Sequence, residues 1–166
     1  MLKISVTGHR PLKIGGYAPC ARHKAIRRHM RELLTKLKAE NSDLLLYSGG
    51  ALGIDQFWME VGQHLEIPVV AILPFPGFAS VWPQASQDYL KILLAKCQST
   101  RYVHNTLIPD KQWAAQAMLD RDQELVNACD LLVAYWNGTR GGTAHTVRLA
   151  NKTRKDLLTF NPDEIY

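Results

Sequence analysis

Three short runs of apolar residues constrain the fold of this chain more than any other feature. LLLY at 44–47, VVAIL at 69–73 and LLVAY at 131–135 are apolar throughout and do not alternate with polar residues. A strand with one face in water alternates, whereas a parallel strand covered by helices on both faces is continuously apolar. The three runs therefore predict a buried, mostly parallel sheet with a layer of helices on each face.

Amphipathic segments separate these runs and complete a regular alternation of strands and helices. The predicted strands are 3–7, 44–47, 68–74, 101–104, 131–135 and 157–160. The predicted helices are 18–40, 52–65, 85–96, 111–128 and 143–155. This βαβ series predicts an α/β fold. A chain of 166 residues with 46% hydrophobic residues fits one domain spanning 1–166.

Composition excludes several classes of protein. No apolar run approaches the roughly 20 residues of a membrane span. The first residues, MLKISVTGHRP, lack the apolar core of a signal peptide, so we expect a cytoplasmic protein without a membrane partner. Its three cysteines lie far apart and form no CxxC pair. We therefore predict no disulfide framework, no metal site and no cofactor.

The formal net charge of +5 is concentrated in one segment of the chain. Residues 13–38 carry a net charge of +7, and the rest of the chain carries −2. Apolar residues recur at helical spacing within this segment and leave the cations on the opposite face. A solvated helix face is the simplest interpretation, and attraction of phosphate or nucleic acid remains open.

Glycine gathers in the loops that follow three of the predicted strands. Ligands of open parallel sheets bind outside the carboxyl ends of the strands, near the point where the strand order reverses. Nine of the eleven glycines lie in the loops after 3–7, 44–47 and 131–135. The candidate ligand-binding residues of these loops are Gly8, His9, Arg10, Gly15, Ser48, Gly49, Gly50, Gly53, Asp55, Gly138, Gly141, Gly142 and Thr143.

Two of these loops run directly into a helix, at Gly53 and at Gly142-Thr143. Backbone amides at a helix start, brought close to a ligand by glycine, suit a phosphate group. The Thr143 hydroxyl is placed either to cap its helix or to contact a phosphate oxygen. Ordinary tight turns are the alternative. Neither GxGxxG nor GxxxxGK[ST] occurs in the chain, which disfavours an ordinary dinucleotide fold and a P-loop ATPase.

Arg121 is the most informative single residue. It occupies a step of the apolar seam formed by Ala114, Met118, Leu125 and Ala128 on one helix. A buried guanidinium needs a partner, since an unpaired buried charge is unfavourable.

The partner of Arg121 is either a protein carboxylate, such as Asp130 or Asp55, or an anionic ligand. The other candidates also have structural interpretations. His9 can be a hydrogen-bonded structural group, and Asp55 can simply favour the helix dipole.

Four ordered motifs resemble a known family. TGHRP, SGGALGID, WPQASQDY and MLDRDQELVNACDLLVAYWNGTRGGT together are similar to the YpsA-like family of the SLOG superfamily, which also contains the DprA/Smf and LOG proteins. The resemblance implies a Rossmann-like fold whose pocket holds nucleotides, nucleotide sugars or ADP-ribose derivatives. It places Met118, Arg121, Gly142 and Thr143 on LOG-type motifs.

The resemblance implies a pocket more clearly than it implies chemistry. LOG proteins cleave the N-glycosidic bond of nucleoside monophosphates with an Arg and a Glu, but this chain has Thr143-Ala144-His145-Thr146 where the Glu-bearing turn is expected. A threonine does not replace that carboxylate. We therefore expect binding of a small nucleotide derivative as the main function.

Two rival functions remain open. The first is a LOG-like hydrolase using Asp55 or Asp120 as a substitute carboxylate. The second is a DprA-like protein that binds single-stranded DNA through the basic helix, although we expect only weak nucleic-acid association because no aromatic residues are interleaved with its cations. A homo-oligomer is also left open.

Overall fold

A computed structural model describes residues 1–106 and 110–166 of the chain, which form six strands and five α-helices. The strands are β1 (Leu2–Gly8), β2 (Leu44–Ser48), β3 (Val69–Leu73), β4 (Ser99–Tyr102), β5 (Leu131–Tyr135) and β6 (Asp156–Phe160). The helices are α1 (Ala21–Glu40), α2 (Ile54–His64), α3 (Gln84–Ala95), α4 (Lys111–Ala128) and α5 (Gly142–Lys152). Two short 3-10 turns, η1 (Pro11–Lys13) and η2 (Pro162–Glu164), follow β1 and β6.

All six strands are parallel and form one sheet in the order β4-β3-β2-β1-β5-β6. The chain builds the sheet outward from β1 to β4, crosses back, and continues with β5 on the other side of β1. The strand order therefore reverses between β1 and β5, where Val6 pairs with Val133. This arrangement confirms the predicted α/β fold with a parallel sheet.

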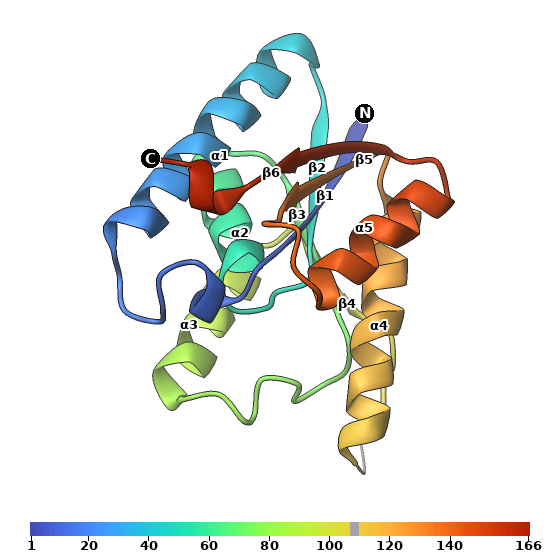
Figure 1. The fold of residues 1–166 in the computed structure, drawn as a ribbon. Coiled ribbons are helices and arrows are strands. Elements are labelled where there is room, and N and C mark those ends of the chain that lie inside the picture. Colours follow the sequence, from blue (N-terminus) through green and yellow to red (C-terminus); the bar gives the residue numbers. More distant parts are fainter. Residues whose placement is uncertain (107–109) are drawn as a thin grey trace.

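The helices cover both faces of the sheet, as Figure 1 shows. Helices α1, α2 and α3 lie on one face, where α2 contacts β1, β2 and β3. Helices α4 and α5 pack against each other and against β1 on the opposite face. The apolar strand residues are buried between the two layers, which is the physical reason that they do not alternate with polar residues. The fold is Rossmann-like.

Each predicted element is present, and the shifted boundaries have local causes. Helix α1 begins at Ala21 rather than at residue 18, because Pro19 disfavours helical geometry in the residue before it. Helix α2 begins after Gly53, whose φ of +93° is not helical. Helix α5 ends at Lys152, and Arg154 (φ +56°) then turns the chain into β6.

Strand β4 covers Ser99–Tyr102, two residues earlier than predicted. All four of its residues are exposed at the edge of the sheet. An exposed edge strand has no buried apolar face, so its sequence contains little information about its boundaries.

Candidate ligand-binding site

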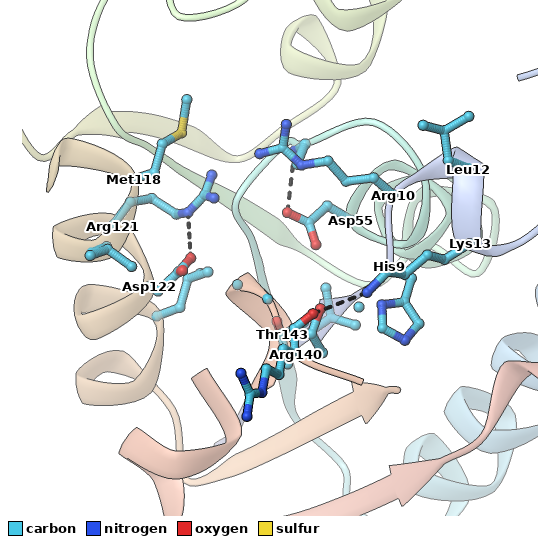
Figure 2. Close-up of a pocket in the computed structure, with 18 residues that line it drawn as sticks. His9, Arg10, Leu12, Lys13, Asp55, Met118, Arg121, Asp122, Arg140 and Thr143 are labelled. Atoms are coloured by element: carbon cyan, nitrogen blue, oxygen red, sulfur yellow. Dashed lines mark hydrogen bonds and ion pairs between the residues drawn. The ribbon is translucent and has the colours of Figure 1, made fainter. Parts of the chain in front are cut away.

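A cavity of about 350 Å³ opens at the carboxyl ends of the strands, where the strand order reverses (Figure 2). It lies between the end of β1, the start of α2, one face of α4 and the start of α5. This is the position at which open parallel sheets bind ligands. The lining residues are Val6, Thr7, Gly8, His9, Arg10, Leu12, Lys13, Ala51, Asp55, Met118, Leu119, Arg121, Asp122, Leu125, Arg140, Gly141, Gly142 and Thr143.

Eight of the residues predicted from the sequence line this cavity. They are Gly8, His9, Arg10, Asp55, Arg121, Gly141, Gly142 and Thr143. The other six, which do not line it, are Gly15, Ser48, Gly49, Gly50, Gly53 and Gly138. Several of these six shape the loops around the cavity: the Ser48 hydroxyl, for example, donates a 2.9 Å hydrogen bond to the main-chain oxygen of Asp55.

Arg121 is buried, with 5% of its surface exposed, and its guanidinium points into the site (Figure 2). Its Nε donates to Asp122 Oδ1 at 2.8 Å, and its Nη1 donates to the main-chain oxygen of Gly49 at 2.7 Å. The carboxylate partner is thus Asp122, and the predicted partners Asp55 and Asp130 form no ion pair with Arg121. Within residues 1–106 and 110–166, Nη2 has no hydrogen-bond acceptor.

Gly49 is required by the close approach of the arginine. A Cβ atom on this residue would lie 2.8 Å from Arg121 Nη1 and 2.9 Å from its Cδ. Gly49, in the glycine-rich loop after β2, therefore holds the guanidinium and does not itself line the cavity, although Ala51 of the same loop does.

Asp55 is buried at the start of α2 and forms part of the cavity wall. Its Oδ2 accepts a 3.2 Å hydrogen bond from the Ala51 amide. Burial raises the pKa of its carboxyl from 3.8 to about 6, and the nearby charge of Arg121 partly opposes the increase. Asp55 is therefore a titratable group whose pKa lies close to neutrality inside the cavity.

The start of α2 is not available to a phosphate, contrary to the sequence interpretation. The Ile54 amide donates to the main-chain oxygen of His9 at 3.3 Å, and Asp55 places a carboxylate at this helix end. A Cβ atom on Gly53 would lie 2.7 Å from the same His9 oxygen, so this glycine serves close backbone packing. Only one of the two predicted helix starts thus faces the cavity with open amides.

The start of α5 is the helix end that opens to the cavity. Gly141 is the N-cap and provides no side-chain cap, and Gly142 and Thr143 line the cavity. Because α5 begins at Gly142, the Thr143 hydroxyl does not act as the N-cap. The first-turn amides and the positive end of the helix dipole favour an anionic group here.

His9 anchors the loop after β5. Its Nε2 lies 2.7 Å from Asn137 Oδ1 and 3.0 Å from the Asn137 amide nitrogen. Burial lowers the pKa of the imidazole, and the hydrogen bond to Asn137 partly opposes this. The ring is therefore neutral at neutral pH and connects the two strands at the switch point. Its role in ligand binding stays a prediction.

The cavity also contains residues that the sequence interpretation missed. Lys13 donates from Nζ to Thr139 Oγ1 at 2.8 Å and to the main-chain oxygen of Arg140 at 3.1 Å, and so connects η1 to the loop before α5. The sequence places Lys13 in a basic segment and Arg140 in a glycine-rich loop, and either position could have indicated a residue of the site. Leu12 and Leu119 have no sequence signal, because isolated exposed leucines are ordinary.

The basic face of α1 is partly neutralised within the protein. Arg22 pairs with Asp163 at 3.3 Å, and Arg27 pairs with Glu60 at 2.6 Å. Arg28 donates to the main-chain oxygen of the last residue. The apolar residues of α1 are buried at helical spacing, as predicted. Much of the charge in this helix therefore serves tertiary packing.

No metal-binding cluster occurs in the part of the chain that the structure describes, where no three His, Cys, Asp or Glu side chains gather suitably. The cysteines at 20, 97 and 129 are free thiols. No helix among the described residues has both the length and the apolar character needed to cross a bilayer.

Together, these features define a Rossmann-like α/β protein with a cavity, bordered by cationic side chains, at the switch point of a parallel sheet. The model of the YspA SLOG family matches residues 4–160 of the chain. The chain belongs to this family, which confirms the resemblance seen in its motifs.

Similar proteins extend the family assignment. A UPF0398 protein of Leuconostoc citreum (strain KM20) is 29% identical over 98 residues, which are 56% of this chain and 52% of that protein. A UPF0398 protein of Latilactobacillus sakei subsp. sakei (strain 23K) is 28% identical over 102 residues, which are 58% of this chain and 54% of that protein. The chain thus spans about half the length of the curated relatives it matches.

Among solved structures, DNA processing protein A (DprA) of Streptococcus pneumoniae has a TM-score of 0.68 at 15% identity, over 95% of this chain and 50% of that chain. The molybdenum cofactor carrier protein of Chlamydomonas reinhardtii has a TM-score of 0.57 at 16% identity, over 96% of this chain and 76% of that chain. Likeness at these identities shows a shared fold.

Proposed function

We propose that this protein binds a nucleotide, nucleotide sugar or ADP-ribose-like ligand in the cavity at the carboxyl rim of the sheet. The observation that carries the proposal is the buried Arg121 guanidinium, which is fixed by Asp122 and Gly49 and keeps Nη2 without an acceptor among the described residues. A guanidinium fixed in this way is preorganised for an anion, since little side-chain entropy is lost on binding.

The charges around the cavity support an anionic ligand with hydroxyl groups. The side chains of Arg10, Lys13 and Arg140 and the start of α5 add positive potential to that of Arg121. Asp55 and Asp122 supply carboxylate oxygens, which accept hydrogen bonds from sugar hydroxyls. A phosphate linked to a ribose combines both kinds of group.

We expect ligands of this class to stabilise the protein measurably. A ligand at 100 times its dissociation constant adds about 2.7 kcal/mol to the free energy of unfolding, which raises the melting temperature of a domain of this size by roughly 5–10 °C. Thermal unfolding with AMP, ADP, ADP-ribose and a nucleotide sugar measures the effect, with adenosine as the uncharged control. No shift and no calorimetric heat with any phosphate-bearing compound contradicts the proposal.

A LOG-like hydrolase is the second candidate, and the position of Asp55 favours it. Asp55 lines the cavity and has a pKa near 6, which suits proton transfer near neutral pH. Asp120, the other substitute carboxylate, does not line the cavity and instead lies 2.7 Å from His104 Nε2. Asp55 is therefore the better candidate of the two.

We nevertheless expect little release of free base from nucleoside monophosphates, because the LOG-type glutamate is absent from the turn 143–146. Chromatography of AMP and GMP incubated with the protein measures the release. If the wild-type protein releases free base rapidly and both the Arg121→Lys and Asp55→Asn variants lose this activity, the protein is a hydrolase and does more than bind its ligand. The Asp120→Asn variant is the matched control, since this carboxylate lies outside the cavity.

DNA binding is the third candidate, and we expect it to be weak. A related fold, DprA of Helicobacter pylori, is described by its single-stranded DNA binding mode, at 21% identity and a TM-score of 0.64. In this chain, Arg22, Arg27 and Arg28 already have protein partners. A cluster with few available cations contacts few phosphates, so its affinity for DNA is low.

The DNA test uses exposed cations without a partner in the described residues. We expect a gel-shift titration with single-stranded DNA to show only weak association that disappears between about 50 and 200 mM salt. Lys24→Glu and Arg31→Glu are suitable variants, because substitution of Arg27 also breaks its ion pair with Glu60. Tight binding at physiological salt that these two variants abolish favours the DprA-like function.

A further inference from the structure

One edge of the sheet is open. Strand β6 pairs with β5 on one side and, among residues 1–106 and 110–166, with no strand on the other (Figure 1). Tyr135 lies opposite Phe160 in the parallel register, and the Trp136 amide donates to the main-chain oxygen of Phe160. Alternate residues of β6 therefore face β5, and the main-chain amides and oxygens of Leu157 and Thr159 point to the open edge.

Strand β6 lacks the usual features by which proteins protect an open edge. Its residues 157–160, LLTF, include no charge and no proline, whereas β4 at the other edge carries an arginine. Both faces of β6 are fixed to the rest of the protein. Leu157 packs against the buried cluster that contains Ala150 of α5, and the Phe160 ring lies 4.5 Å from the ring of His29 on α1. An ordered, uncharged edge of this kind is a template for pairing with another strand.

Charge is distributed unequally along the chain around β6. Three cations precede the strand and two acids follow it, namely Lys152, Arg154, Lys155, Asp163 and Glu164. Asp163 pairs with Arg22, whereas Lys152 and Glu164 have no ion-pair partner within the part of the chain that the structure describes. A second β6 in antiparallel orientation brings the basic end of each strand beside the acidic end of the other. A parallel orientation brings like charges together, so the charges favour the antiparallel pair.

We infer that the open edge of β6 is an interaction surface for β6 of a second copy of this chain, in antiparallel orientation about a twofold axis. The two six-stranded sheets join into one, and the outward main-chain groups of Leu157 and Thr159 gain hydrogen-bond partners. Lys152 of each copy lies at the same end of the interface as Glu164 of the other. Because the two sheets run in opposite directions, the two cavities open at opposite ends of the dimer, and the interface is independent of their ligand.

Sedimentation velocity of the wild-type and variant proteins at about 1 to 100 μM measures the dimer. We expect Leu158→Lys to weaken dimerisation at least about tenfold, because twofold symmetry places the new charge at the centre of the interface twice. Leu158 is 37% exposed, so the folded protein tolerates the lysine. Ile92→Lys is the matched control, since Ile92 is an apolar residue of α3 that is 53% exposed and lies outside β6.

A charge exchange tests the antiparallel orientation. Lys152→Glu and Glu164→Lys each place like charges together at both ends of the interface, and we expect each to weaken dimerisation about three- to tenfold at low salt. The double variant pairs opposite charges again, so we expect it to regain the wild-type affinity. Thermal unfolding of each variant confirms that it is folded.

Amide hydrogen exchange distinguishes strand pairing from other contacts of β6. We expect the Thr159 amide to exchange at least about tenfold more slowly in the wild-type dimer than in the Leu158→Lys variant, because pairing protects this outward amide. Equal exchange in the two proteins overturns strand pairing, and a double charge variant that stays weak overturns the antiparallel orientation. A wild-type protein that remains monomeric at all concentrations overturns the whole inference, as does a dimer that Leu158→Lys leaves unchanged or that Ile92→Lys weakens equally.

Discussion

Replacement of Arg121 by alanine is expected to lower the free energy of unfolding by about 3–5 kcal/mol at neutral pH, the usual result of breaking a buried ion pair on one side. The substitution leaves Asp122, which is itself buried, without its cation. It also removes the donor to the Gly49 carbonyl. Urea unfolding of the wild-type and variant proteins measures the difference.

The double variant Arg121→Ala, Asp122→Asn separates the structural role of Arg121 from its ligand role. Without the buried carboxylate charge, we expect it to recover about 1–3 kcal/mol of the lost stability. Its affinity for AMP is nevertheless expected to remain tenfold to a hundredfold below wild type, the worth of about one charge-assisted hydrogen bond. Arg140→Ala, an exposed cation at the same cavity, is the control for loss of positive charge alone.

Full ligand affinity in the folded double variant is the result that rejects a binding role for Arg121. In that case the guanidinium serves only to connect α4 to the loop after β2. Recovery of stability without recovery of affinity instead supports both roles. Proteins commonly retain a buried charge at such a functional site although it does little for stability.

The sequence predicts the order and type of the elements because most of them bury a face. LLLY, VVAIL and LLVAY are buried on both sides by α1 to α5, and this burial is what makes them recognisable. Strand β4 is exposed and lacks such a signal, so its observed boundaries differ from the predicted ones. The helix boundaries that differ from the prediction depend on single residues such as Gly53, whose backbone angles leave no periodic pattern in the sequence.

The candidate site is only partly predictable from the sequence. The rule for ligand positions in parallel sheets and the clustering of glycine identify the correct rim, and Arg121 is conspicuous as a charge on an apolar seam. The same clustering cannot distinguish a glycine that faces the cavity from one that packs on another loop. Gly49 and Gly53 belong to the second kind, because each is needed for contact with a neighbouring segment.

The exposed leucines of the cavity have no sequence signal, whereas Met118 lies on a motif recognised in the sequence. Leu12 lies just before the basic segment 13–38 and Leu119 lies on the exposed side of α4, so neither follows a pattern that indicates a site. They line one cavity because it is bordered both by α4 and by η1, which Lys13 attaches to the loop before α5. This placement of distant segments depends on the tertiary fold.

Replacement of Asp55 by asparagine is expected to stabilise the protein above pH 6. The carboxyl has an ordinary pKa of 3.8 in the unfolded chain and a pKa of about 6 in the folded protein. Between these values the folded state binds more protons, so the contribution of Asp55 to stability is fully present below about pH 4 and is lost as the pH rises through 6. A shift of about two pH units corresponds to about 3 kcal/mol.

Asparagine does not ionise, keeps an oxygen for the Ala51 amide and therefore avoids this loss. We expect the Asp55→Asn and wild-type proteins to be equally stable near pH 4, and the variant to be more stable by about 2–3 kcal/mol at pH 7.5. Asp120→Asn is the control with the opposite sign, because hydrogen bonds from Gln116 and His104 lower the pKa of Asp120.

Chemical denaturation at pH 4, 5, 6 and 7.5 measures the Asp55 effect. If Asp55→Asn loses stability at pH 7.5, the carboxylate acts mainly as a partner of Arg121, and burial does not control its ionisation. If Asp55→Asn instead gains stability but binds AMP more weakly, burial does control the ionisation of Asp55. This result also indicates that the chain keeps an ionisable group in the cavity at the expense of stability, because the ligand requires a carboxylate at that position.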